Sequence, residues 1–226
     1  MTHYYVLDTE TTGTTDDAGV CEIAWIEIDE DFNIIETVES LIDPQQPISP
    51  SASGTHGLVN ADLQDSPTLR EFFEVVRGKG LAGPAVVIGH RVGFDTKFLP
   101  DFVEGGISEV CTLRWARSMY PDHDNHKLST LMYALNLPKT GSHRALGDVM
   151  TAYWLMRHIC DMHGFSLSEL AARSKEPLPV RYMPFGKHKG QPLAEVPVSY
   201  LRWALKEMKN LDIDLKHAFE VRTGQK

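Results

Sequence analysis

Two acidic residues follow a short apolar run near the start of the sequence. Residues 4–7 read Tyr-Tyr-Val-Leu, a run typical of a buried strand, and Asp8 and Glu10 come directly after it. Side chains two residues apart on a strand share a face, so the two carboxylates are expected side by side. Such like charges repel unless a cation lies between them, and hard oxygen ligands favour Mg²⁺ or Mn²⁺. An isolated Asp-x-Glu is more often only a solvated strand end, so a site requires partners elsewhere in the chain.

Asp148 opens a segment with helical periodicity. Ala152, Leu155 and Ile159 fall on one apolar stripe, and Asp148 lies on that stripe four residues before Ala152. A carboxylate that faces a core is costly without a partner, and a shared metal ion would be one. An acid that only balances the helix dipole in the first turn is the simpler alternative.

His143 and Asp95 could complete such a site. On one helix, His143 and Asp148 would point about 140° apart, so we place His143 in the preceding loop, free to reach over the carboxylates. Histidine side chains in general can exchange a proton near neutral pH, which suits a general base for water. Asp95 follows residues 85–89, a predicted parallel strand, and open α/β sheets bind ligands beyond such strand ends.

In this order and spacing, the three segments resemble the three motifs of the DEDDh exonucleases, a family with an RNase H-like fold. The resemblance extends over roughly residues 4–163, and each motif is weak by itself. One departure is Arg91, which stands where the second motif often has Asn. The matching residues are Asp8-Thr-Glu-Thr-Thr-Gly13, His90 to Asp95, and His143-Arg-Ala-Leu-Gly-Asp148.

The resemblance implies hydrolysis of a terminal phosphodiester from the 3′ end, with release of nucleoside monophosphates. Asp8, Glu10, Asp95 and Asp148 would hold two ions of Mg²⁺ or Mn²⁺, one to activate water and one to stabilise the leaving oxygen. His143 would accept the proton of the water. Arg144 could contact phosphate or form an ion pair. The candidate substrate contacts in this region are Thr11, Thr12, His56, Arg91 and Phe94.

The rest of the sequence predicts an α/β fold. Strands are expected at residues 21–29, 33–41, 85–89 and 107–111, and a Pro- and Ser-rich loop at 44–54. Helices are expected near residues 69–76, 113–119 and 128–135 and after Ala145. Capping-box signals at Thr68 and Ser166 predict the start of the first of these helices and of one more short helix. Residues 122–126 hold side chains able to bind metal but lack a Cys-rich or His-x3-His frame, so they predict a polar loop. Together these elements predict a mixed β-sheet flanked by helices, the RNase H-like architecture.

The C-terminal residues differ from the rest in charge. Residues 1–174 carry a net charge of −13 and residues 175–226 a net charge of +4. We therefore expect an exonuclease domain at residues 1–173, a linker at 174–182 and a small basic module at 183–226. The Met-Pro-Phe-Gly-Lys-x-Lys-Gly segment at 183–190 resembles the C-terminal module of exonuclease X-like proteins. An amphipathic helix is expected at residues 198–210. Its cationic face and the basic turn could hold single-stranded nucleic acid through Lys187, Lys189, Arg202 and Lys206, or the helix could simply present a solvated face.

Composition limits the remaining possibilities. Three widely spaced cysteines argue against a disulfide framework, and neither a signal peptide nor a membrane-length apolar run is apparent, so a cytoplasmic protein is expected. We predict a DNA exonuclease that acts on single strands or 3′ ends. An exoribonuclease is the second enzymatic reading, and a catalytically inactive nucleic-acid-binding scaffold is the alternative from another class.

Overall fold

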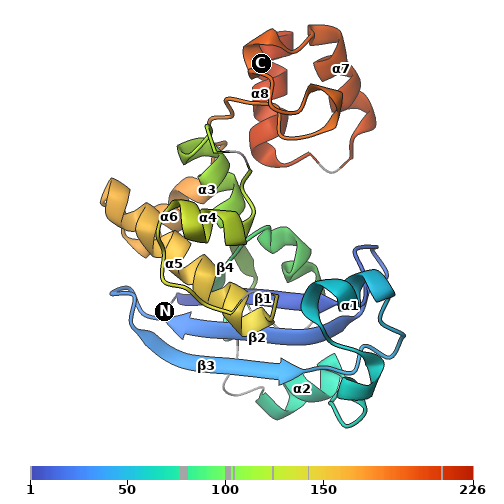
Figure 1. Ribbon diagram of the computed structural model, residues 1–226. Coiled ribbons are helices and arrows are strands. Elements are labelled where there is room, and N and C mark those ends of the chain that lie inside the picture. Colours follow the sequence, from blue (N-terminus) through green and yellow to red (C-terminus); the bar gives the residue numbers. More distant parts are fainter. Residues whose placement is uncertain are drawn as a thin grey trace.

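A five-stranded mixed sheet organises the chain (Figure 1). The computed structural model describes residues 2–76, 81–99, 103, 105–123, 125–141, 143–209 and 211–225. The strands lie in the order β3-β2-β1-β4-β5. β1 pairs with β2 in antiparallel register and with β4 in parallel register. Their bounds are β1 His3–Thr11, β2 Val20–Ile28, β3 Ile34–Leu41, β4 Ala85–Gly89 and β5 Ile107–Cys111.

Helices cover both faces of this sheet. The longest, α5, lies against β1, β2 and β4, and α3, α4 and α6 pack around it, whereas α2 lies on the opposite face. The predicted mixed sheet flanked by helices is therefore confirmed. The helices are α1 Pro50–His56, α2 Leu69–Val76, α3 Thr112–Met119, α4 Leu128–Ala134, α5 Ala145–His163, α6 Leu167–Ser174, α7 Val198–Glu207 and α8 Ile213–Thr223.

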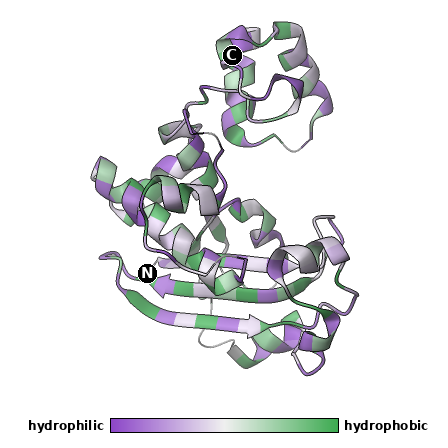
Figure 2. Cartoon of the chain, in the orientation of Figure 1, coloured by the Kyte–Doolittle hydropathy of each residue, from purple (hydrophilic) through white to green (hydrophobic). Residues whose placement is uncertain are grey.

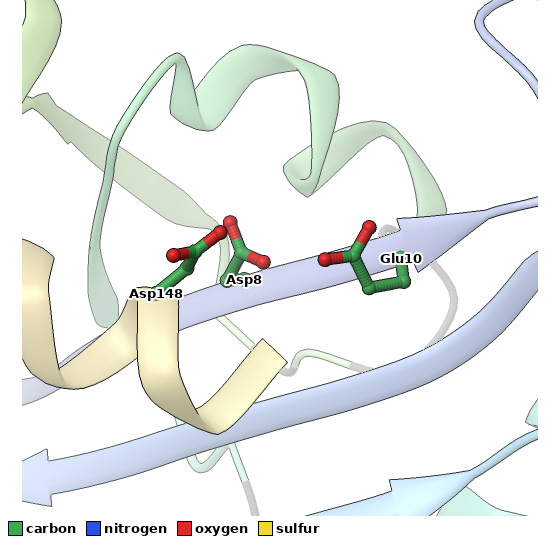
Figure 3. A group of neighbouring side chains, drawn as sticks. All are labelled: Asp8, Glu10 and Asp148. Carbon is green, nitrogen blue, oxygen red and sulfur yellow. The ribbon is translucent and has the colours of Figure 1, made fainter. Parts of the chain in front are cut away.

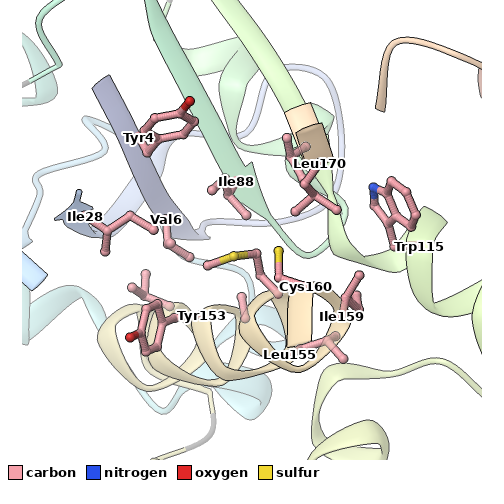
Figure 4. Packing of buried hydrophobic residues seen from close by; sticks show 14 of the residues in the cluster. Tyr4, Val6, Ile28, Ile88, Trp115, Tyr153, Leu155, Ile159, Cys160 and Leu170 are labelled. Atoms are coloured by element: carbon pink, nitrogen blue, oxygen red, sulfur yellow. The ribbon is translucent and has the colours of Figure 1, made fainter. Parts of the chain in front are cut away.

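Strand alternation divides the core into two layers. On β1, Tyr4 and Val6 pack toward α5, while Tyr5 and Leu7 pack toward α2. Figure 4 shows the α5 layer, in which Val6 and Ile88 of the sheet meet helix side chains. Asp8 and Glu10 continue the parity of Tyr4 and Val6, so their side chains extend from the face that carries α5. The alternation of β1 thus decides which helix meets the carboxylates.

One predicted loop contains a helix. Residues 44–54 were expected to be irregular, but α1 begins at Pro50. The Ser49 side chain caps it by accepting a hydrogen bond from the Ala52 backbone at 3.2 Å, and proline is well suited to the first turn. The Ser-Pro pair was the available signal. The capping boxes predicted at Thr68 and Ser166 are both formed.

Residues after α6 form their own apolar cluster. Met183, Leu201 and Phe219 are buried within it, between α7, α8 and the segment that precedes them. In Figure 1 this C-terminal module lies beyond α3, away from β1, β2 and β3. The helix predicted at 198–210 ends at Glu207, and Asn210 lies outside the described residues. The proposed boundaries at 173 and 183 stay a prediction.

Candidate active site

Three carboxylates from two distant segments meet at the edge between β1 and α5. Asp8 and Glu10 extend from β1, and Asp148 extends from the first turn of α5 (Figure 3). Each offers an oxygen, and the three oxygens lie within 4.8 Å of one another. The predicted proximity of these residues is therefore present in the structure. Such a set of hard ligands fits a divalent cation.

The site opposes ionisation of its own carboxylates when no cation is present. Burial raises the pKa of Glu10 to about 7, with further contributions from the charges of Asp148 and Glu22. Burial also raises the pKa of Asp8 well above its usual range, and the surrounding carboxylates raise it further. A bound divalent cation would offset this repulsion and favour the ionised forms.

Asp95 lies beside the cluster but is held by Thr9. Its Oδ1 accepts hydrogen bonds from the Thr9 backbone N–H at 3.1 Å and from the Thr9 hydroxyl at 2.6 Å. Burial raises the pKa of Asp95 to about 7, although these hydrogen bonds oppose the shift. Its charge in turn contributes to the raised pKa of Asp8. The charge of Asp95 thus raises the pKa of both Asp8 and Glu10, while one of its oxygens is bound by Thr9 of β1.

His143 lies in the loop directly before α5, as predicted. It is exposed and adopts a left-handed backbone conformation with φ of 61°. Burial raises the pKa of Asp148, whereas the charge of His143 and a hydrogen bond with the His143 backbone lower it. The imidazole of His143 therefore lies near the Asp148 carboxylate, although His143 itself precedes α5.

A glycine permits the loop to pass over α5. A Cβ at Gly147 would overlap the backbone carbonyl of Gly141. The Thr140 hydroxyl also donates a hydrogen bond of 2.9 Å to the Gly147 carbonyl and lies in hydrogen-bonding contact with the Thr151 hydroxyl. The loop that carries His143 is thereby held against the first turns of the helix.

Comparison with known proteins assigns the chain. The sequence profile of a family described as "Exonuclease" matches residues 5–156. The chain belongs to the exonuclease family. The expected resemblance to DEDDh exonucleases is thus confirmed, and with it the expectation of an enzyme. A second profile, described as "Putative quorum-sensing-regulated virulence factor", matches residues 176–208.

One relative matches nearly the whole chain, and others match the exonuclease part. Exodeoxyribonuclease 10 of Escherichia coli (strain K12) is 26% identical over 95% of this chain and 98% of its own length. The PolC-type DNA polymerase III of Bacillus cereus is 30% identical over 70% of this chain, which is only 11% of the polymerase. A structure of exonuclease X in complex with 5′ overhanging duplex DNA has a TM-score of 0.63 and 27% identity, covering 77% of this chain and 99% of that one.

Sequence reasoning missed a fifth acid of this exonuclease site. Glu22 is fully buried on β2, directly opposite Glu10 in the sheet register. Its carboxylate accepts hydrogen bonds from Arg144 at 2.9 and 3.1 Å and from the Ala145 backbone N–H at 2.9 Å. This decides the open alternative for Arg144 in favour of an ion pair. The available signal was that Glu22 is the one acid among the apolar residues 20–26 of β2.

The predicted substrate contacts at the end of β1 are engaged within the protein. Thr11 and Thr12 are buried, and their hydroxyls bond to the backbone of Gly13 and Gly19. Both ring nitrogens of buried His56 are also occupied, Nε2 at 3.3 Å from the Thr11 carbonyl and Nδ1 as acceptor from the Leu58 N–H. These hydrogen bonds give the three side chains a structural role in shaping the strand end, and a substrate contact through them stays a prediction.

Other predicted contacts are exposed and fall into separate groups. Arg91 is exposed, and its guanidinium lies 5.9 Å from the centre of the half-buried Phe94 ring. In the module, Lys187 lies 5.2 Å from the Tyr200 ring centre, and Lys189 lines the space between module and body. The other two, Arg202 and Lys206, are on α7 and line no part of that space.

Proposed function

We propose that this protein is a 3′→5′ exodeoxyribonuclease that removes nucleoside monophosphates from the ends of single-stranded DNA. The observation that carries the proposal is the meeting of Asp8, Glu10 and Asp148 within 4.8 Å in a chain of the exonuclease family. The preference for DNA is supported by the likeness to exodeoxyribonuclease 10 and to exonuclease X bound to DNA.

The residues present fit divalent cations. Asp8, Glu10 and Asp148 would hold them, and Asp95 would join through the carboxylate that Thr9 orients. We infer that the site binds two Mg²⁺ ions. When bound, two such ions supply an activated water and stabilisation of the leaving oxygen.

Side chains of the protein carry out the remaining tasks, which are proton transfer and positioning. His143 accepts the proton of the attacking water at its imidazole, for which its exposed position beside Asp148 is suited. Glu22 binds Arg144 and the Ala145 backbone, and so fixes the N-terminus of α5 relative to β2. That attachment places Asp148 opposite Asp8. The hydrogen bond from the Thr140 hydroxyl to the Gly147 carbonyl holds the loop that carries His143 against the N-terminal end of α5.

The state of the cysteines bears on where the protein works. The three cysteines are free thiols, which supports a reducing compartment such as the cytoplasm. Among the described residues, no helix is both long and apolar enough to cross a membrane.

The test is hydrolysis of matched oligonucleotides. Purified protein is incubated with DNA and RNA of one sequence, labelled at the 5′ end, with Mg²⁺, with Mn²⁺ or with EDTA. We expect stepwise shortening of DNA from the 3′ end, release of mononucleotides and no reaction in EDTA. Faster shortening of RNA would assign an exoribonuclease, and binding without any product would assign a scaffold.

A further inference from the structure

A cleft of about 610 Å³ lies between the body and the C-terminal module. One wall is formed by the two residues after β4, by α3 and by the loop that follows it. The other is formed by residues 179–184, 189 and 190 and by the start of α8. Hydrophilic segments predominate where the two parts meet (Figure 2). Six cations line the cleft: Arg91, Arg114, Arg117, Lys127, Arg181 and Lys189.

A buried ion pair holds the two walls together. Arg114 on α3 binds Asp214 on α8 through contacts of 2.6 and 2.8 Å, and both side chains are mostly buried. Arg114 also donates a hydrogen bond of 2.8 Å to the Ser174 carbonyl, and the Leu178 N–H donates to Asp214 at 2.7 Å. The connecting segment and the module are thus fixed to α3, so the cleft has a defined shape.

The other two aspartates of the cleft also have cationic partners. Asp122 accepts a hydrogen bond of 2.9 Å from the Tyr182 hydroxyl and lies 3.3 Å from Arg181. Asp212 lies 3.3 Å from Arg117. The predicted polar loop at 122–126 therefore contributes a module contact, and Asp124 lies outside the described residues. Every described acid that lines the cleft is paired across the two walls.

This pairing leaves an excess of positive charge. Arg91, Lys127 and Lys189 are exposed, and none has a carboxylate within ion-pair distance among the described residues. They stand on both walls of the cleft. Unpaired cations that face one another across a groove attract a polyanion, and phosphodiesters are the polyanion that this enzyme family handles.

One end of the cleft lies a single turn of the chain away from Asp95. Arg91 lines it, and the single turn Val92–Phe94 separates Arg91 from Asp95. His90, also on the wall, fixes the neighbouring loop, because its Nε2 lies 2.8 Å from the His126 carbonyl and its Nδ1 3.0 Å from the Thr112 hydroxyl. A strand with its 3′ end at the carboxylates could therefore continue past Arg91 between the two walls.

We propose that the cleft between the body and the module binds the phosphates of the single-stranded DNA that lies 5′ of the nucleotide being removed. This inference rests on the function proposed for the carboxylate site. It assigns Arg91, Lys127 and Lys189 to the substrate strand, and it gives the module the role of one wall of a substrate channel. Lys127, which sequence reasoning did not select, is the new contact on the body.

The test compares two charge-matched double variants of the full-length protein. Lys127→Ala with Lys189→Ala removes one cation from each wall of the cleft. Lys175→Ala with Lys216→Ala removes two exposed lysines that do not line it. Binding of a labelled twelve-nucleotide oligothymidine is followed by fluorescence anisotropy across a salt titration, in EDTA to prevent cleavage.

We expect the cleft variant to bind about tenfold more weakly than wild type at low salt. The slope of log affinity against log salt should become shallower by about 1.4, since each phosphate contact on a single strand contributes about 0.7. The control variant should retain the wild-type slope. Equal affinity and slope in the two variants would overturn the proposal. Release of mononucleotides from a trinucleotide by wild type with Mg²⁺ tests the catalytic proposal separately, because so short a strand does not need the cleft.

Discussion

Arg144 and Glu22 form an ion pair that joins the start of α5 to the middle of the sheet. Glu22 is fully buried, whereas half of the Arg144 side chain is exposed. Because the buried partner is the acid, removing Arg144 leaves a carboxylate without its cation in the core, while removing Glu22 leaves an arginine that water can reach. The two residues are therefore not equivalent in their contribution to stability.

We predict that Arg144→Ala lowers the free energy of unfolding by about 1–3 kcal/mol, the range for a buried polar group that loses its partner. Adding Glu22→Gln to that variant should recover part of the loss, because the amide carries no charge and can still accept from the Ala145 N–H. Urea denaturation of the two single variants and the double variant measures the coupling. Additive losses would show that the pair does not act as a unit.

Removal of a metal ligand should abolish hydrolysis and stabilise the metal-free protein. Asp148→Asn removes a charge whose repulsion contributes to the raised pKa of Asp8 and Glu10. We expect nearly complete loss of nuclease activity together with a higher melting temperature in EDTA. Mg²⁺ should raise the melting temperature of the wild type, and we expect a smaller rise in the variant. Wild-type activity in Asp148→Asn would contradict the assignment of this carboxylate.

The raised pKa of Glu10 predicts a pH-dependent stability without metal. Between the ordinary value of 4.5 and the folded value of about 7, the folded state binds more protons than the unfolded state. Stability contributed by this group is therefore lost as the pH rises through that window. The partly buried His90, whose pKa is lowered by desolvation to about 4, acts in the opposite direction.

Comparison with Glu10→Gln reports on the glutamate and on its repulsion of Asp8, because His90 and the other carboxylates are common to both proteins. In EDTA, the variant should gain stability relative to wild type as the pH rises from about 4.5 to 7. Saturating Mg²⁺ should remove or reverse this gain, because the ion favours the charged form. Denaturation at several pH values with and without metal measures the difference, and a constant difference across the window would argue against a raised pKa.

His143→Ala should lower the catalytic rate by roughly 10²–10⁴-fold, the contribution typical of a general base. Metal-dependent stabilisation should persist, because the carboxylates are unchanged. His163→Ala is the matched control, since it removes an exposed imidazole from the opposite end of α5. Single-turnover cleavage measures both variants, and an unchanged rate in His143→Ala would assign the proton to another acceptor.

Gly147→Ala should displace the loop that carries His143. The added Cβ would overlap the Gly141 carbonyl, so the backbone must move. We expect both lower stability and slower cleavage. Gly54→Ala provides the control, because its Cβ on α1 would meet open space. Equal stability and rate in the two variants would show that the loop can rearrange freely.

The sequence by itself determined the family of this protein and most of its elements. Asp8 and Glu10 could be placed on one face of a strand because strand geometry repeats every two residues. The helix after Ala145 was readable from its apolar stripe, and the capping boxes at Thr68 and Ser166 from their residue types. These signals are local: each depends on residues within a few positions of one another.

Tertiary structure alone decided which distant residues became partners. Glu22 and Arg144 are separated by more than a hundred positions, and only the packing of α5 on the sheet brings them together. The same holds for Arg114 and Asp214, which fix the module and create the charged cleft. His56 is likewise buried by the fold, and its ring lies 3.3 Å from the carbonyl of Thr11 at the end of β1. Periodicity and turn residues predict the conformation of a single segment. Burial and ion pairing depend on contacts between segments that are distant in sequence, and these contacts form only when the chain folds.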